Sequence, residues 1–322
     1  MIINMPVAQL DRALVSGASN SGSTPDGHKE KKVNYSINKL YKLMEKCCLC
    51  PRKCGINRLK GEIGLCKTGK DVKVASINLH YGEEPPISSE KGSGTIFFTN
   101  CNLSCVFCQN YPISQLSNGN VITAEQLADK MIELQNQGAN NINLVTPTHV
   151  YPFVAETIFI AKQKGLTIPI LSNCGGYESV EVLELMEEFI DIYMPDMKYS
   201  SNESAKKFSK VDNYVENNRL AIKEMFRQKG HLKINYKEVA EKGLLIRHLV
   251  LPNNVSGSKE TFDFIANEIS TDTYVSVMAQ YHMANLSDKF GEINRKINQK
   301  EYDEVVEYFE YVGLHNGWVQ EL

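Results

Sequence analysis

The sequence has no long apolar run, no excess of basic charge and no secretory leader pattern. Uninterrupted apolar residues never approach the roughly 18 that a membrane helix needs, and the first residues lack the basic, apolar and small-residue order of a signal peptide. The 35 Lys and Arg residues against 38 Asp and Glu residues leave a formal net charge of −3, so no global basic field exists to hold nucleic acid or an anionic membrane. We therefore expect a cytoplasmic protein with no membrane partner and no nucleic-acid partner.

The remaining composition is that of a folded enzyme. Of the 322 residues, 42% are hydrophobic, 23% charged and 9% aromatic, which excludes a disordered, collagenous or coiled-coil chain. The length suits one large domain, or a large domain with a small one.

Cysteine is the residue whose distribution is unusual. Of the nine cysteines, Cys174 stands alone and the others fall into two tight groups. The upstream group is Cys47, Cys48, Cys50, Cys54 and Cys66, and the downstream group is Cys101, Cys105 and Cys108. In a reducing compartment, clustered thiols in a chain of this length indicate metal ligands before disulfides.

The chain divides into three parts. Residues 16–32 are rich in Ser, Gly and Lys without apolar periodicity, so we expect residues 1–34 to be a disordered extension that need not belong to the natural protein. Residues 35–90 form a cysteine-rich metal-binding module with a helix at its start and a strand near 72–80. Residues 46–73 carry eight basic residues against Glu62 and Asp71, which indicates a solvated surface or a docking patch.

Residues 91–322 alternate short apolar runs with amphipathic segments. The expected strands are 95–100, 141–147, 168–173, 191–198, 244–252 and 274–281. The expected helices are 123–137, 152–164, 178–188, 212–228 and 258–269, and Thr123 with Gln126 forms a capping box at the start of the first. Six strand–helix units predict an α/β fold with parallel strands, either a partial (β/α)6 TIM-like barrel or a doubly wound sheet. In both, chemistry lies at the carboxyl ends of the strands.

The downstream cysteines follow the first of these strands directly. TIFFTN runs into Cys101-Asn-Leu-Ser-Cys105-Val-Phe-Cys108, so three thiols lie within eight residues at the catalytic end. Three thiolates can hold three corners of an iron–sulfur cubane, which leaves one iron without a protein ligand. A structural zinc site closes all four positions, so the pattern indicates an open, reactive metal centre. Buried or zinc-binding cysteines at chance spacing are the structural alternative.

The segment CNLSCVFC resembles the CxxxCxΦC signature of the radical S-adenosylmethionine (SAM) superfamily, with Phe107 as the aromatic residue. The resemblance implies a 4Fe–4S cluster on Cys101, Cys105 and Cys108, with SAM bound to its fourth iron and Phe107 against the adenine. An external donor would reduce the cluster, and SAM would be cleaved to methionine and a 5′-deoxyadenosyl radical that removes a hydrogen atom from the substrate.

From about Cys47 to the C-terminus, the sequence is similar to the pyruvate formate-lyase activating enzyme group, in particular its PflX-type relatives. By that resemblance Asn173, in LSNCGGYES, approaches the methionyl part of SAM, and Asp196 and Lys198, in DIYMPDMKY, form the Asp-x-Lys element of the site. AQYHM gives Tyr281 for cofactor binding and His282 for catalysis. The resemblance implies an activase that places a glycyl radical on a partner protein.

Several of these residues have a structural alternative. Asp196 and Lys198 could form a partly buried ion pair at a barrel mouth, although charged residues are costly to bury unpaired. His149 is either a site residue or a hydrogen-bonded loop histidine. For Arg247 and His248, inside an expected strand, core packing is the expectation for one of the two faces. Cys174 is expected to pack without reacting.

The upstream cysteines have the spacing of a four-thiolate knuckle. Cys47-x2-Cys50-x3-Cys54-x11-Cys66 places glycines beside two of the ligands, and glycine permits the tight turns that bring amides near sulfur. Zinc and a second iron–sulfur cluster both fit, because spacing rarely decides between tetrahedral sulfur sites. Cys48 is not expected to be a ligand.

One segment departs from the superfamily pattern. Many members carry a Gly-Gly-Glu element after the second strand, where this chain has Thr146-Pro147-Thr148.

Two functions other than the activase stay open on the sequence. One is radical modification of a small molecule or an RNA nucleoside, with the basic segment as docking surface, and the other is a metal or redox module without radical chemistry.

Overall fold

The computed structural model describes residues 25–322, with side chains from residue 28, and its central element is a ten-stranded sheet. Seven of the strands are parallel, and their order in the sheet follows their order in the chain. They are β2 (Ser93–Phe98), β4 (Ile142–Val145), β5 (Ile170–Cys174), β6 (Ile192–Pro195), β8 (Ala240–Leu249), β9 (Tyr274–Met278) and β10 (Gly317–Val319). The six expected parallel strands are confirmed, and β10 adds a seventh.

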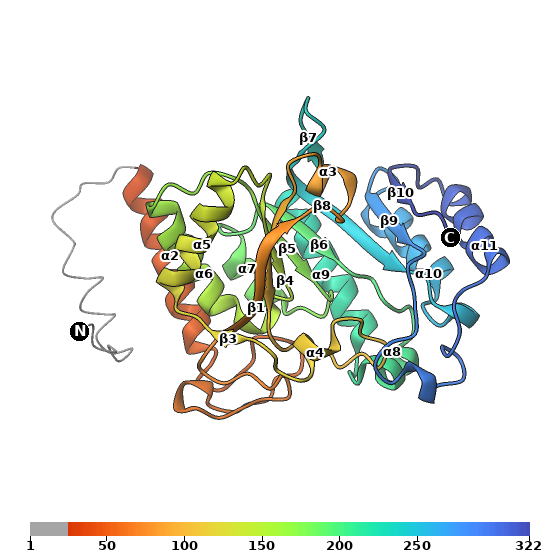
Figure 1. Ribbon diagram of the computed structural model, residues 1–322, viewed down its shortest axis with the longest axis horizontal. Coiled ribbons are helices and arrows are strands. Elements are labelled where there is room, and N and C mark those ends of the chain that lie inside the picture. The colour runs from red at the N-terminus through yellow and green to blue at the C-terminus, as the bar shows by residue number, and fades with distance from the viewer. Residues whose placement is uncertain (1–24) are drawn as a thin grey trace.

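Three antiparallel strands complete the sheet. β1 (Lys73–His80) pairs with β2, and β3 (Asn120–Val121) pairs with the first two residues of β1. β7 (Lys233–Ile234) pairs with β8 and forms the hairpin that projects from one edge in Figure 1. Because these strands lie beside the parallel ones without joining β10 to β3, the described sheet stays open.

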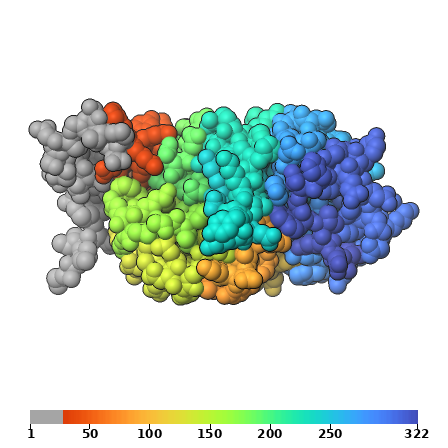
Figure 2. Space-filling view, turned by 90° about the horizontal axis from the view of Figure 1, so that it is seen from above, coloured from red at the N-terminus to blue at the C-terminus, as the bar shows by residue number. Residues whose placement is uncertain are grey.

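The strand order decides between the two folds that the sequence left open. A doubly wound sheet reverses its order at a switch point, whereas here β2, β4, β5, β6, β8, β9 and β10 run without reversal. Right-handed crossovers in one direction place the helices on the same face, which gives a partial barrel. In Figure 1 the helices α5, α6 and α7 lie on the side where α2 is drawn in red, and β9, β10 and α11, drawn in blue, lie at the opposite end. Figure 2 shows the same two ends from above.

The crossover helices occupy the expected segments. They are α5 (Ala124–Asn136), α6 (Tyr151–Gln163), α7 (Val180–Met186), α9 (Tyr214–Lys229) and α10 (Ser258–Phe264), which continues into a π-helical turn at Ile265–Ile269. The capping box of Thr123 and Gln126 is present at the start of α5. The helices α8 (Asn202–Ser209) and α11 (Gln299–Tyr311) and the short helix α4 (Tyr111–Ser114) were not expected.

The first described helix corrects the expected domain boundary. α2 spans Pro25–Lys42, so residues 25–34, which the sequence assigned to the disordered extension, are helical. Val33 packs against the main hydrophobic cluster and Lys32 forms an ion pair with Glu188, contacts with a distant part of the chain that local composition does not reveal. The expectation for residues 1–24 lies outside the described residues.

The cysteine-rich segment shares the core of the barrel. Leu40, Met44, Cys47 and Leu49 belong to the same buried cluster as the residues beneath α5, α6 and α7, and α2 lies beside α6 and α7. β1 also joins this segment to the sheet. Residues 35–90 therefore form an extension of the barrel core.

Side chains along the parallel strands alternate between the two faces of the sheet. On β6, Tyr193 belongs to the main cluster beneath the helices, whereas Ile192 and Met194 belong to a second cluster on the inner face. Ile87, on the short helix α3 (Pro85–Ser88), is fully buried in that inner cluster. α3 thus fills the inner side of the partial barrel.

No helix in the described part of the chain is both long and apolar enough to span a membrane.

A buried carboxyl makes the stability of this fold depend on pH. Burial raises the pKa of Glu178 from 4.5 to about 7, against the hydrogen bond from Thr148. Because the folded protein favours the neutral carboxyl, its contribution is fully present below pH 4.5 and is lost as pH rises through 7.

We expect Glu178→Gln to remove that loss, since the amide cannot ionise. From pH 4.5 to 8, the unfolding free energy of the wild type should fall relative to that of the variant by on the order of 3 kcal/mol. The fall is about 1.4 kcal/mol for each pH unit between the two pKa values. Anaerobic urea titrations measure it. Glu181→Gln, at an exposed position on α7, is the control, and parallel pH profiles for Glu178→Gln and wild type would contradict the expectation.

Candidate active site

The inner-facing side chains at the carboxyl ends of the strands surround one cavity of about 330 Å3. Each of five neighbouring strands or strand ends contributes one of them, because the same side of every strand faces inward. They are Phe97 from β2, Val145 from β4, Asn173 from β5, Asp196 just after β6, and Arg247 from β8. The volume lies at the lower end of the range for ligand pockets, roughly 300–1,000 Å3.

The three downstream cysteines line this cavity together. Each sulfur has a polar partner: the Leu103 amide donates to Cys101 Sγ at 3.3 Å, and Ser209 Oγ and Ser114 Oγ lie 3.0 and 3.2 Å from Cys105 Sγ and Cys108 Sγ. N–H and O–H donors are what anionic sulfur ligands need around them. No three His, Cys, Asp or Glu side chains in the described residues are arranged to hold a single metal ion, whereas a cubane spreads its ligands over separate irons.

The charge of Lys198 supports anionic sulfur in the same place. Burial raises the pKa of Cys101, and it raises that of Cys105 to about 11 against the opposing charge of Lys198. For Lys198, burial alone would lower the pKa, but the Asp196 carboxylate and the nearby thiols outweigh it and raise the pKa. The lysine is therefore a fixed cation beside the three sulfurs.

Asp196 and Lys198 form the ion pair that the sequence analysis named as the structural alternative to a site role. Lys198 Nζ lies 2.5 Å from Asp196 Oδ2, and both side chains are about one-fifth exposed. They also line the cavity. Arg247 Nε lies 4.0 Å from Asp196 Oδ1 and 3.2 Å from Glu84 Oε1, which extends the ion pair into the barrel.

Glu83 and Glu84 are part of the site and were missed by the sequence analysis. They follow β1, and Glu83 lines the cavity with its Oε2 3.5 Å from Arg247 Nη1. Burial raises the pKa of Glu83 and Arg247 opposes it. The signal was an acidic pair between a strand and two prolines, but β1 was assigned to another module, so nothing placed it at the barrel mouth.

Thr146 explains the departure from the Gly-Gly-Glu pattern. It lines the cavity with φ +61°, in the left-handed region that favours glycine. Its amide donates to the Asn173 carbonyl at 2.8 Å. A β-branched residue in this conformation carries strain on the order of 1–3 kcal/mol, so the backbone here keeps the turn that a glycine would make freely.

Three expected site residues lie outside the cavity lining. Phe107 and Tyr281 are buried and pack edge to face with ring centroids 6.0 Å apart, and the Tyr281 hydroxyl donates to the Ile293 carbonyl. His282 is exposed, with Nδ1 3.1 Å from Gln109 Nε2. Gln109 and Gln280 do line the cavity, so His282 stands next to its entrance.

The two strand residues of β8 separate as alternation requires. Arg247 faces the cavity, while His248 is fully buried with Nδ1 2.7 Å from the Met197 carbonyl and Nε2 2.9 Å from Ser258 Oγ. Cys174 is buried as expected and touches the edge of the cavity.

The upstream cysteines form a separate group. Cys47, Cys50, Cys54 and Cys66 line a second, much smaller cavity together with His149. Cys48 is not among its lining residues, and its Sγ lies 4.0 Å from the Leu43 carbonyl.

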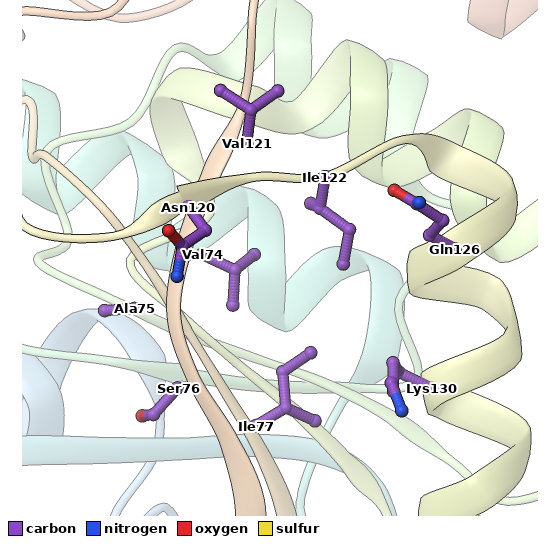
Figure 3. A pocket seen from close by; sticks show the side chains of 9 residues that line it. All are labelled: Val74, Ala75, Ser76, Ile77, Asn120, Val121, Ile122, Gln126 and Lys130. Atoms are coloured by element: carbon purple, nitrogen blue, oxygen red, sulfur yellow. The ribbon is translucent and has the colours of Figure 1, made fainter.

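Another cavity has a larger volume than the one at the strand ends, but its lining lacks the thiols and carboxylates of that site. A cavity of about 440 Å3 lies between β1, β3 and α5 (Figure 3). It is lined by Val74, Ile77, Val121, Ile122, Gln126 and Lys130, among others, and by no Cys, His, Asp or Glu. Residue chemistry, more than volume, therefore identifies the site at the strand ends.

Comparisons with known proteins show which family the chain resembles. The radical SAM superfamily matches residues 95–265, more than half of the chain. The uncharacterized protein MJ0674 of Methanocaldococcus jannaschii is 32% identical over 283 residues, covering 84% of this chain and 76% of that protein. MJ0808 of the same organism is 26% identical over 157 residues, and the match spans 44% of this chain and about half, 46%, of that protein. The solved structure of methylornithine synthase (PylB) has a TM-score of 0.45 at 14% identity, covering 68% of this chain and 61% of that chain.

The chain belongs to the radical SAM superfamily, whose members use a 4Fe–4S cluster and SAM. The residues present fit these groups. Three thiols with hydrogen-bond partners share a cavity with an amide, a carboxylate and a lysine at the carboxyl ends of parallel strands. Cys101, Cys105 and Cys108 would hold the cluster.

Replacing Cys101, Cys105 or Cys108 by Ala should abolish cluster binding at this site and the reductive cleavage of SAM. The loop offers three thiols, and the cluster needs all three of them as ligands. No cysteine of the loop is therefore dispensable. Anaerobic reconstitution, cluster absorbance and chromatography for methionine and 5′-deoxyadenosine measure both effects. Cys174→Ala, which removes a thiol at the edge of the same cavity, should retain both, and undiminished cleavage in all three loop variants would refute the ligand assignment.

Proposed function

We propose that the protein is a radical SAM activase that abstracts a hydrogen atom from a partner protein, as the glycyl radical activating enzymes that it resembles do. The observation that carries this proposal is an apolar rim beside the cluster loop. It joins a cavity suited to SAM to a surface suited to a protein.

The cavity suits SAM by charge. Glu83, Glu84 and Asp196 face Arg247 and Lys198, so three carboxylates oppose two cations and leave a net charge of −1 when all five are ionised. SAM carries a sulfonium and an ammonium against one carboxylate and is a net cation. In a partly buried site this complementarity is worth more than in water.

When bound and reduced, the cluster supplies the electron that cleaves SAM into methionine and a 5′-deoxyadenosyl radical. In the proposal the chain's own residues bind and orient the cofactor. Asp196 offers a carboxylate to its ammonium and Asn173 an amide to its methionyl part, and Lys198 pairs with Asp196. Phe107, behind the cluster loop, would support the adenine of SAM. From the segment at the entrance, Tyr281 would help to bind the cofactor and His282 would take part in catalysis.

The apolar rim consists of five exposed hydrophobic residues. Their exposed fractions range from 41 to 65%, and they are Ile63, Leu65, Leu116, Met283 and Leu286. Hydrogen bonds tie the segments of Leu286 and Leu116 to the cluster loop: the Leu286 amide donates to the Val106 carbonyl, and Gln115 Nε2 donates to the Cys105 carbonyl. The segment of Ile63 and Leu65 joins them through Lys67, whose Nζ donates to the Gln115 carbonyl. Exposed apolar residues gathered next to a site favour a protein partner over a small molecule.

The basic upstream segment supports an RNA substrate less well. Arg58 is 1% exposed and donates to the carbonyls of Gly69 and His149, and Arg52 donates to those of Asn102 and Lys210. Two of the basic residues are therefore used inside the fold.

We further propose a cytoplasmic location with an external electron donor, because the cysteines are free and a thiol-rich centre needs a reducing compartment.

Asp196→Asn should leave iron content unchanged and reduce SAM cleavage at least about tenfold, with weaker SAM binding, because the neutral amide cannot pair with Lys198 or the cofactor's ammonium. Isothermal titration with SAM and single-turnover cleavage measure the two effects. The matched control is Asp129→Asn, which breaks an exposed ion pair with Lys164 of the same 2.5 Å length and should change neither. An active site indifferent to Asp196→Asn would mean that the ion pair is purely structural.

The partner is tested with pyruvate formate-lyase as the probe. Mixed anaerobically with SAM and reductant, the two proteins should give the EPR doublet of a glycyl radical, and Leu116→Glu with Leu286→Glu should reduce that signal at least about tenfold while SAM cleavage without partner persists. Leu220→Glu, at an equally exposed leucine on α9, should not. Active SAM cleavage with no glycyl radical, and tRNA retained at low salt, would favour the RNA alternative.

A further inference from the structure

The four upstream cysteines converge although they are spread over twenty residues. Cys47, Cys50 and Cys66 are 6–7% exposed and line one small cavity with Cys54. The Cys47 amide donates to the Ile56 carbonyl, and the Gly55 amide, at φ +69°, returns to the Cys47 carbonyl. Gly55 permits that left-handed turn at no steric cost, and the turn brings Cys54 back towards Cys47.

A fifth donor comes from the catalytic barrel. His149, in the loop between β4 and α6, is 1% exposed and lines the same cavity. Its Nε2 lies 2.9 Å from the Thr99 carbonyl, and a carbonyl only accepts, so Nε2 carries the proton and Nδ1 holds a lone pair. Nδ1 is buried with no hydrogen-bond partner in the described structure. Leaving such an atom unsatisfied costs roughly 1–3 kcal/mol.

The lining of the cavity holds three basic side chains and no carboxylate. Arg58, Arg52 and Lys53 line it. Arg58 is fully buried, donates to the carbonyls of Gly69 and His149, and forms no ion pair in the described part of the chain. A buried cation without a counter-ion is costly, and metal-bound thiolates are the anions at hand.

We propose that the upstream group holds a second iron–sulfur cluster, with Nδ1 of His149 and three of Cys47, Cys50, Cys54 and Cys66 as the four ligands of its irons. No three of these described side chains are arranged around a single ion, whereas a cluster spreads its ligands over separate irons. The thiol protons leave as the metal binds, and Arg58 balances the resulting negative charge. The His149 imidazole has the arrangement of a metal ligand, with its second nitrogen fixed by a carbonyl.

The geometry also joins this centre to the catalytic one. His149 is held by the carbonyl of Thr99, two residues before Cys101, and the Arg52 Nε donates to the carbonyl of Asn102 directly after it. Both contacts lie at the start of the cluster loop. The second centre therefore fixes the entry to that loop, whichever substrate the enzyme takes.

The experiment isolates the second centre in a full-length variant with Cys101, Cys105 and Cys108 changed to Ala. Purified anaerobically and reconstituted with iron and sulfide, it should retain iron and sulfide in equal amounts. One zinc per chain without sulfide, or a folded triple variant that retains no iron, overturns the proposal. Adding Cys48→Ser should change nothing, because that thiol lies outside the cavity.

His149 is tested in the same background. His149→Ala should speed metal loss to a chelator by about 10–100-fold, whereas His248→Ala, at an equally buried histidine whose two nitrogens are both partnered, should not. Should His149→Ala fail to fold, 15N-histidine labelling of the chain with the native His149 gives the answer by pulsed EPR of the reduced second cluster. Nitrogen coupling that changes with the label confirms the donor, and its absence shows that His149 does not bind the metal.

Discussion

Seven parallel strands that end at the same edge are the constraint on which the rest of the structure depends. Each strand has one inward side, so each can offer only every second residue to the cavity. Phe97, Val145, Asn173, Asp196 and Arg247 are those residues. Their neighbours Phe98, Leu144, Cys174 and His248 are buried, and most of them lie beneath the helices. One alternation thus separates a polar site from an apolar core within a single set of short strands.

The inner face cannot remain polar along its whole depth, and α3 resolves that conflict. Its Ile87 is buried against Leu171, Ile192 and Met194, which removes the deeper part of the barrel from water. The carboxylates just before α3 then meet Arg247, and Arg247 reaches Asp196. These charges are expensive to bury singly, so the chain arranges them as a connected set that is anchored on one side by a packed helix and opens on the other side to the cavity.

The sequence predicts the elements that depend on local residue patterns. It predicts less well the positions of residues that depend on contacts with distant parts of the chain. The Thr123–Gln126 capping box correctly starts α5, and Asn298 with Glu301 forms the same device before α11, a signal that was available and not used. Tyr281 and His282 came from the family resemblance of AQYHM, at the end of the strand expected over 274–281, but β9 ends at Met278. Beyond it the alternation no longer applies, so Tyr281 turns into the core and His282 into solvent. Arg58 looks like a surface charge in sequence, but it is buried and donates to the carbonyls of Gly69 and of His149, 91 residues away.

The loop between β4 and α6, which departs from the family motif, is held at several points of the barrel mouth. Thr146 keeps a left-handed turn at the cavity and its amide donates to the Asn173 carbonyl, Thr148 donates to the buried Glu178, and His149 contacts the Thr99 carbonyl at the start of the cluster loop. Three residues of this short stretch thereby contact three separate parts of the barrel mouth. A loop with so many fixed ends cannot relax around a strained residue, so the strain at Thr146 is held by contacts on both sides. The same contacts keep the carbonyl of Thr99, and with it the first cysteine of the cluster loop, in one position relative to the upstream thiols.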